Sequence, residues 1–295
     1  MIDVVWDMET NDPDDFLALL MLVGHPMVNL KAVTILPGSA AQVGLVRYAL
    51  QEWFQLDIPI GARNLDSTKK TVSEWHYQAL GNIPPSRDAQ PADIILREYC
   101  DNNTILITGA ALTNIRTAIR KSQEQNDIIT AKNIVVQGGF AGDGVVPQDL
   151  QLDKFKGVST CPTHNLMGDS KATELILEHE GFGLRRFVSK NVCHSVIYDE
   201  QMHKTIAEVK DSSLSLSKIW QGMEVYLKTI NPDGKMLHDL LAVACAIDST
   251  VGTWVEVELF REGAEWGAKP ISGSKTWIII DYDHDKFLKI LLDCR

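Results

Sequence analysis

The stretch VVWDMETNDPDDFLALLML, residues 4–22, places five carboxylates between two apolar runs. The first run is short and contains β-branched residues, which favours a strand, whereas the second has apolar residues at helical spacing. Asp12 followed by Pro13 is typical of a helix start, with Asp12 as the N-cap and Pro13 in the first turn. The sequence therefore predicts an acidic loop between a strand and a helix, and its acids are Asp7, Glu9, Asp12, Asp14 and Asp15.

The same alternation of strand and helix patterns continues along the chain. Strand-like runs such as residues 30–36 and 103–107 alternate with helix-like segments such as residues 92–100 and 169–179. Such alternation predicts an α/β fold with a mostly parallel central sheet flanked by helices. Because no repeat or break in composition divides the chain, we expect one domain over residues 1–295.

Two other segments complete the predicted organisation. Residues 64–92 are polar and rich in turn formers, which predicts a long, lid-like surface segment. Trp75 and His76 lie within it, and we expect such residues to anchor the segment more often than to stack on a ligand. The tail after residue 253 is predicted to hold two strands and a final helix.

Composition limits the classes of function. The chain is 45% hydrophobic and 23% charged, as in ordinary globular proteins, and its net charge is −11. Nucleic-acid binding is disfavoured because it needs a basic surface. The five scattered cysteines predict reduced thiols, and the N-terminus lacks the pattern of a signal peptide. No apolar run is long enough to cross a membrane. We therefore expect a cytoplasmic protein.

The acidic loop needs a physical explanation, because five nearby carboxylates repel one another. The helix dipole accounts for Asp14 and Asp15 in the first helical turn, but not for the other three acids. Solvated capping acids on a surface loop are one interpretation. We favour a hard divalent cation, since calcium and magnesium take oxygen ligands and one loop can supply several. Ligands of open α/β sheets also bind at the carboxyl ends of strands.

Two later motifs point to the same kind of site. KMLHDLLAVACAID, residues 235–248, places His238 and Asp239 at the start of an apolar helix. A histidine beside an acid in a cleft can act as a general acid near neutral pH, although simple N-capping is the alternative. LITGAALTNI, residues 106–115, predicts a tight strand-to-helix turn at Thr108, where a backbone group could bind a ligand.

In this order, DMETNDPDD (residues 7–15), TGAALTN (108–114) and LHDLLA (237–242) resemble the motifs of the nucleoside hydrolase family, inosine-uridine-preferring type. That family carries an acidic motif written DxDPGxDD, a central TGPLTN and a late HD before a helix. Residues 30–39 and 161–173 are also similar to family segments, so the resemblance runs from residue 2 to about residue 250.

The resemblance implies a nucleoside-hydrolase-like fold and hydrolysis of the N-glycosidic bond of a ribonucleoside to ribose and free base. It implies one calcium ion that holds the ribose diol and the attacking water, and an oxocarbenium-like transition state. It also implies a small-molecule nucleoside substrate, a role in purine or pyrimidine salvage, and a homodimer or homotetramer without nucleic-acid or membrane partners.

The resemblance also assigns roles to residues. The implied metal ligands are Asp7, Glu9, Asp15, the backbone carbonyl of Thr108, and Asp239. The implied catalytic residues are Glu9 and Asp14, which act on the water or the ribose, and His238, which faces the leaving base. The implied substrate-binding residues are Asn11, Asp14, Ser39, His164 and Asn165.

The chain departs from the family pattern at several of these positions. The acidic loop is one residue longer than usual, so Glu9, Asn11 or Asp12 could fill the second acid position. Ser39 stands where the family usually has Asn, and Thr163 where it usually has Glu. These changes leave open the hydrolysis of another N-riboside, such as a modified nucleoside or a nucleotide, and a non-cleaving metal- and ribose-binding protein. A magnesium phosphotransferase fits the His–Asp pair less well.

Overall fold

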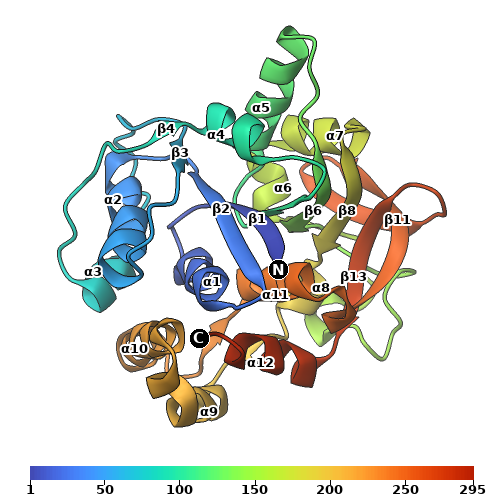
Figure 1. Cartoon of the computed structure of the whole chain (residues 1–295). Coiled ribbons are helices and arrows are strands. Elements are labelled where there is room, and N and C mark those ends of the chain that lie inside the picture. Colours follow the sequence, from blue (N-terminus) through green and yellow to red (C-terminus); the bar gives the residue numbers. More distant parts are fainter.

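The computed structural model describes residues 1–295 and is built around one large sheet (Figure 1). Its eleven strands lie in the order β4-β3-β2-β1-β5-β6-β8-β13-β11-β12-β7. Neighbours from β4 to β13 are parallel, and the three strands beyond β13 pair antiparallel. The strands are β1 (Ile2–Met8), β2 (Val28–Ile35), β3 (Ile60–Ala62), β4 (Gln90–Pro91), β5 (Thr104–Thr108), β6 (Ala131–Gln137), β7 (Thr160–Cys161), β8 (Phe182–Val188), β11 (Gly252–Glu262), β12 (Glu265–Pro270) and β13 (Thr276–Tyr282). A separate antiparallel pair joins β9 (Ile197–Tyr198) to β10 (Lys235–Met236).

Helices cover both faces of the sheet, as the sequence predicted. They are α1 (Pro13–Gly24), α2 (Ala40–Tyr48), α3 (Glu74–Leu80), α4 (Ala92–Tyr99), α5 (Thr113–Glu124), α6 (His164–Gly168), α7 (Ser170–Glu178), α8 (Lys190–Cys193), α9 (Glu200–Val209), α10 (Leu214–Thr229), α11 (His238–Ile247) and α12 (His284–Leu292). Alternate residues of β1 enter two cores. Val4 and Trp6 pack in the core formed with α1, α10 and α11, and Val5 packs in the core formed with α4, α5 and α7.

The topology explains why the site lies at the end of β1. The chain runs from β1 to β2 and β3 on one side and later returns to β5 on the other side of β1. Such a switch point leaves a crevice at the carboxyl ends of the strands, where ligands of open α/β sheets bind. In register at this edge, Asp7 of β1 lies opposite Thr34 of β2 and Thr108 of β5.

The structure corrects one detail of the predicted organisation. The tail holds three strands, not two, because Gly263 takes a left-handed φ of 59° in a tight turn that separates β11 from β12. The segment 64–92 contains α3 and β4 and is anchored as expected. Trp75 and His76 are buried, and the indole nitrogen of Trp75 donates to the carbonyl of Gly222 in α10 at 2.8 Å.

No helix of the structure is long and apolar enough to cross a lipid bilayer.

Candidate active site

The predicted acids converge at the carboxyl ends of β1 and β5. Glu9 follows β1, Asp15 lies in the first turn of α1, and the backbone N–H of Glu9 donates to Asp15 Oδ1 at 3.0 Å. Asp239 enters from the first turn of α11, a helix far along the chain that packs against α1. Two separate segments, residues 7–15 and the start of α11, therefore supply the cluster, and only the fold brings Asp239 to the acidic loop.

Gly109 marks the centre of this cluster. A Cβ atom on Gly109 would lie 2.5 Å from Asp239 Oδ1 and 2.7 Å from Asp15 Oδ1. Both carboxylate oxygens thus approach the same point beside the backbone that follows Thr108. Only glycine leaves room for this approach, which explains the glycine in the predicted turn.

Asp14 joins the two helices at the site. Its Oδ2 accepts hydrogen bonds from the backbone N–H groups of His238 at 2.5 Å and Asp239 at 2.9 Å. It thereby caps α11, for which the preceding residue, Leu237, supplies no side-chain cap. The other oxygen, Asp14 Oδ1, is buried without a hydrogen-bond partner, and the same holds for Asp239 Oδ1.

Burial and mutual repulsion raise the pKa values of these acids. Burial raises the pKa of Asp7 and that of Asp14 to about 6. It raises the pKa of Asp15 well above the ordinary range, and the nearby charge of Asp239 adds to the effect. The pKa of Asp239 rises in the same way, first through burial and then through Asp14. A cation among these oxygens would reverse the effect, because it favours the ionised carboxylates.

Asp7 lies at the base of the cluster with partners for both oxygens. Its Oδ1 accepts from Thr34 Oγ1 at 2.6 Å and from Asn114 Nδ2 at 2.9 Å. Its Oδ2 accepts only from Thr108 Oγ1, at 3.3 Å. Oδ2 is therefore the oxygen that Asp7 has available for a further ligand. No motif in the sequence marks Thr34 as a residue of the site, whereas Asn114 belongs to the TGAALTN motif.

Of the three residues that could fill the second acid position, Glu9 has a side chain that is 13% exposed, whereas that of Asp12 is 52% exposed. The charge of Glu9 raises the pKa values of Asp15 and Asp239, and the charge of Asp12 raises those of Asp14 and Asp239. Asn11 is exposed, and Asp12 accepts from the N–H of Asp14 at 2.9 Å as the cap of α1. Glu9 Oε1 also lies 3.6 Å from Nε2 of His164, and this contact raises the pKa of His164.

Lys235 is a residue of the site that sequence reasoning missed. It is 5% exposed, and its ammonium lies 2.8 Å from Asp12 Oδ1. Its charge opposes the rise in the pKa of Asp14 that burial causes. A single lysine in the sequence gives no sign of burial. Only the pairing of β10 with β9 places it beside the acidic loop.

Two of the predicted substrate-binding residues, Asn165 and Ser39, already make hydrogen bonds within the protein. Asn165 Nδ2 donates to the carbonyl of Gly109 at 2.8 Å and to Oε1 of Gln137 at 2.8 Å, so its amide nitrogen is already used by the protein. Ser39 caps α2 and shares a 3.1 Å hydrogen bond with the hydroxyl of Thr71. The hydroxyl of Thr163 is buried without a partner.

His238 lies beside the cluster and is half-buried, with the charges of Lys235 and Lys154 near its ring. Its Nδ1 is 3.1 Å from Cys193 Sγ. Burial lowers the pKa of His238 to about 3, and the charge of Lys235 contributes. The ring is therefore neutral at neutral pH, and it can offer a leaving base the N–H of a neutral imidazole.

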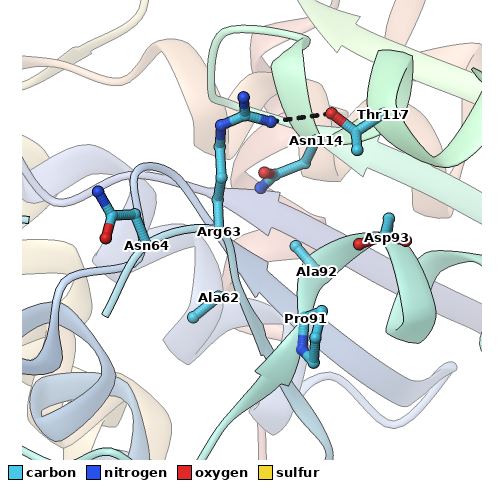
Figure 2. Close-up of a pocket in the computed structure, with 8 residues that line it drawn as sticks. All are labelled: Ala62, Arg63, Asn64, Pro91, Ala92, Asp93, Asn114 and Thr117. Carbon is cyan, nitrogen blue, oxygen red and sulfur yellow. Dashed lines mark hydrogen bonds between the residues drawn. The ribbon is translucent and has the colours of Figure 1, made fainter. Parts of the chain in front are cut away.

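A separate pocket of about 350 Å³ has Asn114 among its lining residues (Figure 2). It is lined by residues at the ends of β3 and β4 and by the first turns of α4 and α5, and Arg63 Nη1 donates to Thr117 Oγ1 there at 2.8 Å. None of the predicted metal or substrate residues lines it. Asn114 connects this pocket to the acidic cluster, because its Nδ2 donates a hydrogen bond to Asp7 Oδ1.

The switch point of this open α/β sheet holds a group of buried carboxylates, at the place where such folds bind their ligands. The chain belongs to the inosine-uridine preferring nucleoside hydrolase family, whose model matches residues 4–289. It is therefore a hydrolytic N-glycosidase by family, as the sequence predicted. The family is metal-dependent, and one group of side chains in this structure, Cys193, His194 and His238, lies close enough together to hold an ion.

Solved structures confirm the fold. A plant nucleoside hydrolase is 15% identical with a TM-score of 0.69, over 98% of this chain and 97% of that one. A purine-preferring ribonucleoside hydrolase from Gardnerella vaginalis is 19% identical with a TM-score of 0.67, over 99% and 97%. An inosine-uridine preferring nucleoside hydrolase from Bacillus anthracis is 17% identical with a TM-score of 0.68, over 99% of each chain. No curated protein sequence matches the chain.

Proposed function

We propose that this protein hydrolyses the N-glycosidic bond of a ribonucleoside to ribose and free base, and that it requires calcium. The observation that carries the proposal is the pair of buried carboxylate oxygens without partners, Asp14 Oδ1 and Asp239 Oδ1, at the switch point of the sheet. Buried unpaired charge is strongly unfavourable, so such oxygens imply a ligand that supplies positive charge or hydrogen-bond donors.

The oxygen donors fit a hard cation. The proposed ligands are Glu9, Asp15 and Asp239, the backbone carbonyl of Thr108, and Asp7 through its Oδ2. Five protein oxygens suit calcium, which takes six to eight ligands, better than magnesium, which usually keeps several waters. When bound, the ion would supply positive charge that acidifies a water molecule and orients the sugar diol.

The chain's own groups would perform the remaining steps. Glu9 is an ionisable carboxylate at the edge of the cluster, and its side chain is 13% exposed, so it can accept a proton from water. Asp14 Oδ1 has no protein partner and can accept a hydrogen bond from a ribose hydroxyl. His238 would donate its N–H to the leaving base, which stabilises the charge that develops as the bond breaks.

A second candidate substrate is an N-riboside with an anionic substituent, such as a nucleotide. Thr163 removes the acid usual at this position, and its hydroxyl has no partner. Lys190 lies next to it, with Nζ 2.9 Å from the carbonyl of Pro162. A glutamate would repel an anion, whereas a neutral hydroxyl would not and a nearby ammonium would attract it. The cytoplasmic location and the homodimer or homotetramer stay predictions from the sequence.

A reducing-sugar assay over nucleosides and nucleotides tests the proposal, with calcium and then with a chelator. We expect free ribose, or ribose phosphate from nucleotides, only with calcium. Asp239→Asn should abolish the release, whereas Glu52→Gln, which removes an exposed carboxylate in the turn Ala49–Trp53, should not change it. Equal release in chelator would contradict the role of the ion. No release from any substrate would contradict hydrolysis.

A further inference from the structure

A second cluster of ligand atoms lies beside the carboxylates, on the other side of His238. Cys193 Sγ and one ring nitrogen each of His194 and His238 all lie within 4.8 Å of one another. The two clusters meet at the start of α11, where His238 faces one and Asp239 faces the other.

Two fixed helix ends position these three side chains. Cys193 ends α8, whose cap, Ser189 Oγ, accepts from the N–H of Asn191 at 3.2 Å. His194 follows directly, and its ring centroid is 4.9 Å from that of His238. His238 is held through its backbone by Asp14. The ligand atoms are therefore presented by anchored backbone and not by a mobile loop.

The chemistry of these atoms differs from that of the acidic cluster. A thiolate and two imidazoles suit zinc and related transition metals, whereas calcium and magnesium prefer oxygen. We propose that Cys193, His194 and His238 form a binding site for zinc, separate from the carboxylate site. On binding, the Cys193 thiol would lose its proton to solvent as the zinc–sulfur bond forms, and both rings would bind as neutral imidazoles.

One neighbouring side chain would favour metal binding at these three residues, whereas nearby lysines would oppose it. Gln137 Nε2 donates to Cys193 Sγ at 3.6 Å and would orient the thiolate. Lys154 Nζ lies 2.8 Å from Nδ1 of His194, so its ammonium must move away or that ring must bind through its other nitrogen. Lys190 and Lys235 also bring positive charge near these rings. Asp12 and Asp14 bring negative charge.

Occupation of this site would affect the reaction. The Nδ1 atom of His238 would then bind zinc, which would fix the orientation of the ring. This step rests on the proposed function, in which His238 donates to the leaving base. Zinc should therefore change the rate of base release in the calcium-loaded protein without displacing calcium.

Cobalt, which substitutes for zinc and has visible spectra, gives a test that needs no turnover. Co²⁺ is titrated into the calcium-saturated full chain, and bound metals are counted after dialysis. We expect one equivalent of cobalt beyond calcium and a near-ultraviolet charge-transfer band from the thiolate. Cys193→Ser should remove the band and weaken binding by about tenfold or more. Cys245→Ser, a buried thiol on α11, is the matched control and should keep both.

Two further variants keep the test decisive if Cys193→Ser does not fold. His194→Asn should also weaken cobalt binding, and Lys154→Met should strengthen it by removing the competing ammonium. A cobalt complex without a thiolate band, or equal binding in all variants, would overturn the proposal. Because these readouts do not use activity, a protein that binds cobalt but cleaves no nucleoside would contradict only the proposed function.

Discussion

Replacing Asp15 by Asn should stabilise the metal-free protein and abolish its response to calcium. Asp15 Oδ1 and Asp239 Oδ1 both approach the position that a Cβ on Gly109 would take, at 2.7 and 2.5 Å. The two oxygens are therefore no more than about 5 Å apart, and at that separation two unit charges repel by about 3 kcal/mol with an effective dielectric constant of 20. Asn removes this repulsion, and its Oδ1 can still accept the hydrogen bond from the N–H of Glu9.

The assay is thermal unfolding at pH 8 in chelator and in calcium. Because about 1 kcal/mol changes the melting temperature of a chain of this size by about 2 °C, metal-free Asp15→Asn should melt up to about 6 °C above the metal-free parent. Calcium should raise the melting temperature of the parent but not that of the variant. Glu52→Gln is the control and should follow the parent in both buffers. A less stable metal-free variant, or one that calcium still stabilises, would refute the repulsion and the ligand assignment.

Three other predictions follow from the same cluster. The folded protein holds the pKa of Asp7 and that of Asp14 at about 6, above their value of about 4 in the unfolded chain, so metal-free stability should fall as the pH rises from about 4 to about 7. Calcium should accordingly stabilise more at pH 8 than at pH 5 in thermal melts, and equal increments would count against this assignment. Gly109→Ala would press a methyl group against Asp239 and should weaken calcium binding by about 10- to 100-fold in calorimetric titrations, so unchanged affinity would show that the cluster is not the site. His238→Ala should slow the release of poor leaving bases more than good ones, and a uniform effect across a nucleoside series would remove His238 from that role.

Much of the fold could be predicted from local patterns, because alternating strands and helices leave few architectures. Asp12 and Pro13 defined the start of α1 correctly, and Asp12 accepts from the N–H of Asp14 as a cap should. The tail was less predictable. A single glycine, Gly263, decides whether one long strand-like run stays whole or folds into a hairpin.

The candidate site could be predicted only where its residues lie in motifs. The acidic loop, Thr108 and the His238–Asp239 pair stand out in the sequence because several unusual residues are close together. Lys235 and Cys193 do not stand out, because their burial beside the cluster depends on β10 and α8 being brought there by the rest of the chain. The second function of Asp14, as the cap of a helix more than 200 residues away, has no local signal for the same reason.

The central claim is that the carboxylate cluster holds the ion on which hydrolysis depends. The most direct measurement adds calcium stepwise to metal-free protein and records bound calcium and released sugar together, using the best substrate of the panel. We predict that the rate of sugar release rises in proportion to the first bound equivalent and then stays constant. Full release before any calcium is bound, or bound calcium without a rise in rate, would contradict the claim.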